Sequence, residues 1–221
     1  MGRLKVALLV PVFILATASA ALADPILIAS TGGLNETNNS LALGLPGGSS
    51  ATIAVVKNPS WADPFAGSQW VSFTRTGDPS DPFWAQLPNG TSVSFFHTFD
   101  LPDAQGYIGS LSVMADDSVT LFLNGQLLIP EAPGAGNSYL TCSDFAMGCL
   151  GTTSAMVDLS PLLQGGLNTL QFDVAQRQNS SFGLDYTGSV DTAQVPEPSS
   201  LLLLGTGILG LVAAVRRRVR R

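Results

Sequence analysis

Between its two ends the chain alternates hydrophobic and polar residues with a period of two. From Thr91 to Leu101, for example, Val93, Phe95, His97 and Phe99 fall on one side. Such alternation predicts half-buried β-strands, because successive side chains of a strand point to opposite faces of a sheet. The same pattern or a short apolar run predicts further strands at 51–56, 70–75, 107–115, 118–123, 126–129, 153–159, 170–174 and 182–186.

Residues typical of turns separate these segments. Asn124-Gly125 lies between two apolar runs and predicts a tight hairpin, because both residues tolerate a positive φ. Between residues 24 and 191 no long helical periodicity occurs. We therefore expect an all-β domain, a sandwich of about eight or nine strands.

The first 23 residues have the features of an export signal. Arg3 and Lys5 precede an apolar stretch from 6 to 16, followed by small residues. Ala21 and Ala23 have the spacing of a signal-peptidase site, so the mature chain is expected to start at Asp24. An uncleaved signal anchor is the alternative.

The last 30 residues, 192–221, have three parts. Val195-Pro196-Glu197-Pro198 comes first, an uncharged run from 199 to 215 follows, and an arginine cluster occupies 216–221, beginning with Arg216, Arg217 and Arg218. As a helix the run would measure about 25 Å, at the short end of what crosses a hydrocarbon core of roughly 30 Å. The pattern predicts a transmembrane helix over about 199–215 with cytoplasmic arginines. An anchor that is never cut is the alternative.

This tail resembles the PEP-CTERM signal of bacterial surface and exopolysaccharide-associated proteins, which is also labelled an ice-binding-protein C-terminal domain. The resemblance implies export through the Sec machinery and processing by an exosortase. It also implies that the C-terminal helix anchors the chain in the inner membrane until processing, after which the chain reaches the cell surface or the extracellular matrix. Residues 195–198 and 216–218 would form the processing signal.

The remaining segment, 24–191, is long enough for one domain of 168 residues. It contains 15 acidic residues against Lys57, Arg75 and Arg177, a net charge of 3 − 15 = −12, although the whole chain has a formal charge of −6. Such a domain would repel nucleic acid and anionic polymers. Neutral polysaccharide, cations or other surface proteins are the partners that this charge allows.

The two cysteines, Cys142 and Cys149, both lie in this segment. In an oxidising compartment we expect them to form a disulfide, with free thiols as the alternative. Two cysteines and a single histidine cannot complete a zinc site. We expect no cofactor.

Two segments, Ala115–Gly125 and Val157–Phe172, are similar to the strand–turn–strand units of galactose-binding-like jelly rolls. The resemblance implies a jelly-roll-like sandwich. It says little about function, because such domains serve both as sugar-binding modules and as spacers.

Aromatic residues and the single histidine are candidates for ligand contact or chemistry. Trp84 lies in a proline-rich stretch and could stack on a sugar ring, although tryptophans also pack in cores. His97 shares a strand face with Phe95 and Phe99, which favours a core or edge histidine over a catalytic one.

Carboxylates form two small groups, Asp78 with Asp81 and Asp116 with Asp117. Calcium binds oxygen ligands in loops of this kind, but aspartates also cap turns, so both interpretations stay open. Adjacent strand residues point to opposite faces, which argues against Asp116 and Asp117 as a glycosidase pair.

The sequence thus predicts an exported, non-enzymatic binding or structural module, with carbohydrate as a candidate ligand. The alternatives are a carbohydrate-active enzyme of the extracellular matrix and a spacer. An enzyme would need a cleft with two carboxylates roughly 5 to 9.5 Å apart.

Overall fold

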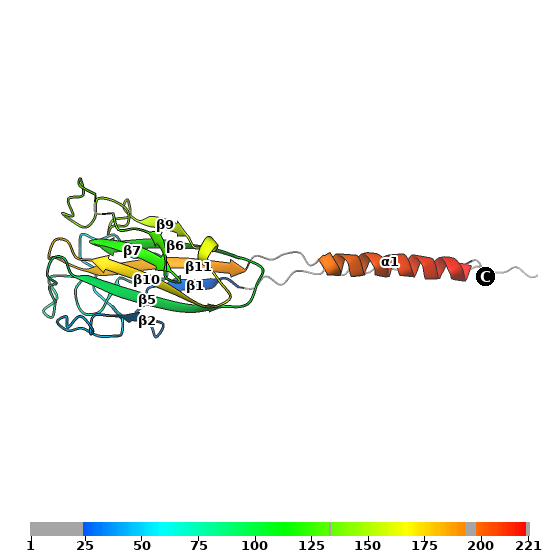
Figure 1. Cartoon of the computed structure of the whole chain (residues 1–221), viewed down its shortest axis with the longest axis horizontal. Coiled ribbons are helices and arrows are strands. Elements are labelled where there is room, and N and C mark those ends of the chain that lie inside the picture. The colour runs from blue at the N-terminus through cyan, green and yellow to red at the C-terminus, as the bar shows by residue number, and fades with distance from the viewer. Residues whose placement is uncertain (1–23, 133, 193–197, 220–221) are drawn as a thin grey trace, which may run out of the picture.

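In this computed structural model residues 24–132, 134–192 and 198–219 are described. Two antiparallel sheets face each other, which confirms the predicted all-β sandwich (Figure 1). The first sheet contains β1 (Ile26–Ala29), β3 (Ile53–Ala54), β4 (Val71–Ser72), β6 (Tyr107–Asp116), β9 (Ala155–Asp158) and β11 (Gly183–Thr192). The second contains β2 (Glu36–Asn38), β5 (Ser92–Leu101), β7 (Ser118–Leu123), β8 (Gln126–Ile129) and β10 (Gly166–Ala175).

The strand order is β3-β4-β11-β6-β9 in the first sheet, with β1 on β11, and β2-β5-β10-β7-β8 in the second. The described residues thus form eleven strands, and the sequence did not predict β1 or β2. The sequence of β2, Glu36-Thr37-Asn38, is polar and has no strand pattern of its own. It is a strand because it pairs with β5, where Glu36 lies opposite His97.

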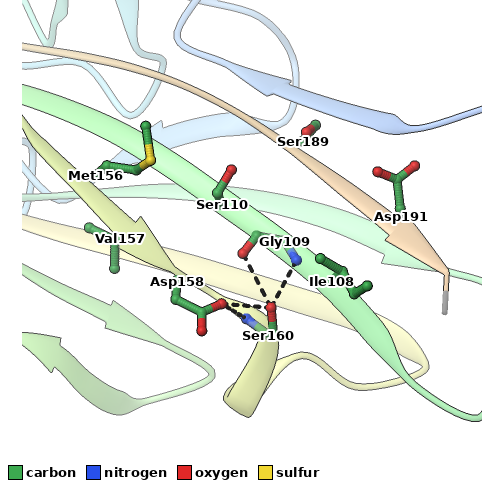
Figure 2. Close-up of a pocket in the computed structure, with 9 residues that line it drawn as sticks. All are labelled: Ile108, Gly109, Ser110, Met156, Val157, Asp158, Ser160, Ser189 and Asp191. Atoms are coloured by element: carbon green, nitrogen blue, oxygen red, sulfur yellow. Dashed lines mark hydrogen bonds between the residues drawn. The ribbon is translucent and has the colours of Figure 1, made fainter.

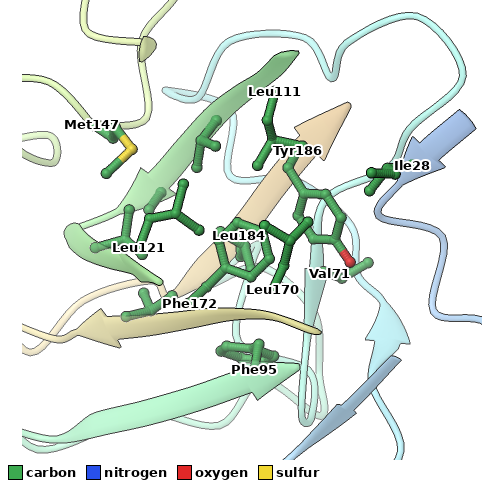
Figure 3. Packing of buried hydrophobic residues seen from close by; sticks show 14 of the residues in the cluster. Ile28, Val71, Phe95, Leu111, Leu121, Met147, Leu170, Phe172, Leu184 and Tyr186 are labelled. Carbon is green, nitrogen blue, oxygen red and sulfur yellow. The ribbon is translucent and has the colours of Figure 1, made fainter. Parts of the chain in front are cut away.

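Two long ladders form the centre of the sandwich. β5 pairs with β10 over ten residues, and β6 pairs with β11 over ten. Their inward side chains fill the space between the sheets, as Phe95, Phe172 and Tyr186 do in Figure 3. The rings of Phe172 and Tyr186 stack with centroids 4.5 Å apart. The alternation read from the sequence therefore places the core correctly.

The hairpin predicted at Asn124-Gly125 joins β7 to β8. Both residues have positive φ, 53° and 76°. Asn124 also accepts a hydrogen bond from the Thr169 backbone N–H through its side-chain oxygen, at 2.9 Å, and so ties the turn to β10.

The C-terminal helix α1 extends over Pro198–Val219, with Arg216, Arg217 and Arg218 in its last turn. Within the described part of the chain, no helix is long and apolar enough to cross a membrane. The predicted transmembrane helix over 199–215 is therefore not confirmed.

Some predicted sites lie outside the described residues. These are the cleavage residues Ala21 and Ala23 and the sorting residues Val195, Pro196 and Glu197. Signal-peptide cleavage before Asp24 stays a prediction.

Candidate functional site

The junction between β6 and β7 places two carboxyl groups in the interior. Asp116 is the last residue of β6, and Asp117 lies between the two strands. The side chains of Asp116 and Asp117 are 3% and 0% exposed. The expectation that they point to opposite faces is wrong, because their carboxyl groups lie within hydrogen-bonding reach of each other. Regular strand alternation does not extend through Asp117, which belongs to neither strand.

Each of the two carboxyl groups accepts hydrogen bonds through only one of its oxygens. Asp116 Oδ2 accepts a hydrogen bond from Trp61 Nε1 at 2.5 Å. Asp117 Oδ2 accepts bonds from the backbone N–H groups of Arg177 at 2.5 Å and Gln178 at 3.2 Å. The remaining oxygens, Oδ1 of Asp116 and Oδ1 of Asp117, are buried and have no hydrogen-bond partner. A buried polar atom without a partner is costly and rare in folded proteins.

The surroundings of the pair disfavour two negative charges. Burial raises the pKa of Asp116 well above its ordinary value, and the neighbouring Asp117 raises it further. Burial also raises the pKa of Asp117, although a proton shared with Asp116 and hydrogen bonds from the Arg177 and Gln178 backbone oppose this. Two carboxyl groups in contact cannot both ionise without a compensating cation. The pair therefore retains a proton or binds a cation.

The positive charge of Arg177 lowers the pKa of Asp117, but it is the smallest of the contributions, and the guanidinium itself bonds Glu131. Its Nε donates to Glu131 Oε1 at 2.8 Å, and the same oxygen accepts from Ser118 Oγ at 2.6 Å. Burial would raise the pKa of Glu131, but the bonds from Arg177 and Ser118 outweigh it and lower that pKa. The charge of Arg177 is thus matched by Glu131, beside the pair.

A small apolar cluster packs against the pair. Trp61 contacts Trp70 with ring centroids 4.3 Å apart, and both pack with Cys142 and Cys149. The two cysteines form a disulfide with a Cα–Cα distance of 5.6 Å, as the sequence predicted. Trp61 and Trp70 are therefore core residues.

The arrangement is unsuited to glycoside hydrolysis, since the two carboxyl groups touch and glycosidase pairs are roughly 5 to 9.5 Å apart. It offers two free carboxylate oxygens, which are hard ligands suited to calcium or magnesium. Among the described residues, no group of three or more His, Cys, Asp and Glu side chains could hold a metal ion. A cation at the pair would need backbone or other neutral oxygens to complete its coordination.

The other calcium candidates, Asp78 and Asp81, bond within their own turn. Asp78 Oδ1 accepts from the Ser80 N–H at 2.8 Å, and Asp81 Oδ1 accepts from the Phe83 N–H at 2.9 Å. Asp81 also forms an ion pair with Arg75 at 3.3 Å. These contacts fit the turn-capping interpretation.

The aromatic residue that this turn exposes is Phe83. Trp84, the predicted ligand contact, is half-buried, and its Nε1 donates to the Thr76 carbonyl at 3.1 Å. Phe83 is 71% exposed. The Arg75 guanidinium lies 5.1 Å from the Phe83 ring centroid and holds the ring in place. The sequence missed Phe83 because a phenylalanine in a loop gives no sign of its exposure.

His97 is a core histidine, as its strand position suggested. It is buried, and its Nδ1 lies 2.9 Å from the Tyr186 hydroxyl. Burial lowers the pKa of His97, and the nearby charge of Glu36 opposes that effect. The histidine, Tyr186 and Glu36 thus form a polar group inside the sandwich.

An open depression also lies on the outer face of the first sheet (Figure 2). Its side chains come from β6, β9 and β11 and include Ile108, Met156 and Asp191. Asp158 at its edge accepts two bonds from Ser160, from N at 2.9 Å and from Oγ at 2.6 Å. None of the residues that line the depression has a buried unpartnered side-chain atom. Such atoms occur at Glu36 and Thr52 and, twice in adjacent residues, at Asp116 and Asp117, which we take as the candidate site.

Comparison with known families identifies the tail. Residues 194–218 match the family model described as the PEP-CTERM protein-sorting motif. The resemblance stated from the sequence is confirmed, and the motif marks an exported protein that is sorted to the surface. No curated protein sequence matches the chain significantly.

Several solved structures are similar to the sandwich at low identity. A family 35 carbohydrate binding module from Clostridium thermocellum has 13% identity and a TM-score of 0.39, covering 76% of this chain and 99% of the other. A second family 35 module, from an environmental isolate, has 14% identity and a TM-score of 0.33, covering 65% and 90%. A β-glucosidase from Kluyveromyces marxianus has 20% identity and a TM-score of 0.30, covering 52% and 12%. Likenesses this weak do not indicate a function for the chain.

Proposed function

We propose that this chain is an exosortase-processed surface protein whose sandwich is a non-enzymatic binding module organised by a calcium ion at Asp116 and Asp117. The observation that carries the proposal is the pair of buried oxygens, Asp116 Oδ1 and Asp117 Oδ1, that have no partner. A divalent cation would compensate both carboxylates and use both free oxygens.

Calcium suits these residues better than other common cations. It takes six to eight oxygens in irregular geometry and accepts backbone carbonyls, whereas magnesium demands an octahedral shell and keeps several waters. Zinc favours histidine and thiolate ligands, and the two cysteines are joined in a disulfide. The net charge of −12 on residues 24–191 (3 − 15) also attracts cations.

The ion would fasten three segments that meet at the pair. These are the β6–β7 junction, the segment that contains Trp61, and the backbone at Arg177 and Gln178. Loops carry most binding surfaces, and they bind more tightly when they are ordered beforehand. We infer that calcium orders this end of the sandwich for contact with another surface molecule.

Calorimetric titration of the full chain with calcium chloride tests the site. The wild type should bind calcium, and the double variant Asp116→Asn/Asp117→Asn should lose binding because it removes both charges. Asp100→Asn changes an exposed aspartate of β5 and is the matched control, which should bind like the wild type. Equal binding by the double variant, or no binding by the wild type, would refute the site.

We further propose that the exosortase recognises Pro196-Glu197-Pro198. Both prolines fix φ near −65° and restrict the residue before them, so the tripeptide is stiff and extended. In a host with the matching exosortase, replacing the three residues by alanine should leave the exported chain unprocessed and heavier by its tail on immunoblots. Thr192→Ala, just upstream, is the control. Equal processing of the wild type and the triple variant would contradict the proposal.

A second candidate function is binding of a neutral polysaccharide through Phe83. The specific observation is an exposed aromatic ring, fixed by Arg75, on a chain that carries a surface-sorting motif. On a glycan array Phe83→Ala should lose binding, whereas Leu34→Ala, which alters another exposed apolar side chain, should retain it. Unchanged binding by Phe83→Ala would exclude this contact, and release of reducing ends from a polysaccharide would favour the enzymatic alternative.

A further inference from the structure

The loop between β8 and β9 contacts the Asp116–Asp117 pair on one side and the Trp61 segment on the other. The Ser143 N–H donates to the Asp117 carbonyl at 2.9 Å, and the Ala115 N–H donates to the Gly148 carbonyl at 3.3 Å. On the other side, the Ala62 N–H donates to the Cys149 carbonyl at 2.9 Å. The segment 142–149 thus connects both sides of the candidate site.

This segment is closed by the Cys142–Cys149 disulfide at its two ends. Both cysteines are almost fully buried and pack with Trp61, whose indole N–H holds Asp116 Oδ2. The disulfide therefore fixes the two points at which the segment meets the Asp117 and Trp61 sides. Without the covalent link, these two contacts could separate.

The segment is packed closely enough that a single methyl group would disturb it. A Cβ at Gly148 would lie 2.4 Å from the Ser143 carbonyl oxygen and 2.7 Å from Thr153 Oγ1. Ser143 is the residue that bonds Asp117. By contrast, a Cβ at Gly151 in the same loop would meet nothing within 4 Å.

We propose that the Cys142–Cys149 disulfide is a positioning element of the calcium site, so that the chain binds calcium tightly only when the disulfide is formed. This inference rests on the proposed function of the Asp116–Asp117 pair. It makes the site conditional on an oxidising compartment, because the reduced loop no longer holds Asp117 and Trp61 in register. The sorting motif marks a protein that reaches such a compartment.

The redox step is a thiol–disulfide exchange. On oxidation, a disulfide-bearing oxidant outside the cytoplasm accepts two electrons and two protons from the two thiols, and the S–S bond forms. On reduction with dithiothreitol, the bond breaks, both sulfurs gain protons, and the reagent becomes its cyclic disulfide. No other group of the chain changes its oxidation state.

Calcium titration of the full chain with and without dithiothreitol tests the inference. Reduction should weaken calcium affinity roughly 10- to 100-fold, the usual effect of losing support around metal ligands. Equal affinity in both states would overturn the inference and leave the calcium site standing. No binding by the oxidised chain would overturn the calcium site itself, and the inference with it.

A second comparison keeps the cysteines oxidised and so does not depend on the reduced chain remaining folded. Gly148→Ala should weaken calcium affinity by a similar factor, because the added methyl group displaces Ser143. Gly151→Ala should leave it unchanged. Tryptophan fluorescence should report the same difference, since the Trp61 indole bonds Asp116. Equal calcium affinity in the two variants would show that the loop does not position the site.

Discussion

Two buried carboxylate sites on the first sheet differ in how their oxygens are satisfied. Asp185 on β11 is 0% exposed and receives three hydrogen bonds, from Ser30 Oγ at 2.9 Å, Ser68 Oγ at 2.5 Å and the Phe65 N–H at 3.0 Å. The Asp116–Asp117 pair is equally buried, but each carboxyl group keeps one oxygen without a partner.

Asp185 has all of its oxygens hydrogen-bonded, whereas Asp116 and Asp117 each keep one unused oxygen. Burial raises the pKa of Asp185, but its three donors oppose the effect and use both of its oxygens. Asp185 thus joins β11 to the segments at Ser30, Phe65 and Ser68 and needs no further partner. The unused oxygens of Asp116 and Asp117 belong to two interacting carboxyl groups, whose combined charge a shared proton or a bound cation would offset.

The largest change in the free energy of unfolding should come from replacing Asp185, whose two oxygens are both hydrogen-bonded. Asp185→Ala leaves the Phe65 N–H without an acceptor and removes the carboxylate acceptor of the Ser30 and Ser68 hydroxyls, which keep only backbone carbonyls. Each lost bond to a charged group costs about 1.5–3 kcal/mol. We expect a loss of about 3–5 kcal/mol in the free energy of unfolding, measured by urea denaturation. The exposed Asp100→Ala should change it by less than about 0.5 kcal/mol. A small loss for Asp185→Ala would remove the contrast between the two sites.

The next largest effect should be the stabilisation of the fold by calcium bound at Asp116 and Asp117. At a free calcium concentration about one hundred times the Kd, the wild type should gain about 2.7 kcal/mol in the free energy of unfolding. Asp116→Asn/Asp117→Asn should show no such gain, whereas Asp185→Asn should retain it from a lower starting stability. Denaturation with calcium and with chelator measures both. A calcium gain in the double variant would mean that the ion binds elsewhere.

The smallest expected effect is the pH dependence of the free energy of unfolding in the absence of calcium. Because the pKa of Asp116 is raised in the folded chain, its shared proton stabilises the fold fully below the ordinary aspartate pKa of about 3.9, and this stability is lost as pH rises through the raised pKa. The slope should not exceed about 1.4 kcal/mol per pH unit for one proton. In the presence of a chelator, Asp116→Asn should make the free energy of unfolding fall less steeply with pH over this range. A pH profile like that of the wild type would count against a shared proton.

Several features of this protein could be predicted from the sequence because they depend on the pattern of residues that are close together in the chain. Alternation along 91–101 predicts a strand and places Val93, Phe95 and Phe99 in the core without any knowledge of their partners. Asn124-Gly125 predicts its hairpin because positive φ is a property of those two residues. The sorting motif is likewise a contiguous stretch, matched at residues 194–218.

The candidate site could be predicted only in part. The sequence considered Asp116 and Asp117, but strand alternation suggested that they point apart. It offered Trp84 as a candidate sugar contact, with packing as the alternative, whereas the structure exposes Phe83 and buries most of Trp84. Exposure and side-chain direction at a strand end depend on which loops lie above them, and those loops come from elsewhere in the chain.

The sorting motif, the sandwich and a possible pairing of the two cysteines could all be inferred from contiguous sequence. The contact between Trp61 and Asp116, which are 55 residues apart, became visible only in the folded chain. The same holds for the contact between the Arg177 backbone and Asp117, which are 60 residues apart. The physical reason is that strand pattern and turn preference act between neighbours, whereas the satisfaction of a buried carboxylate depends on donors that folding brings from distant segments.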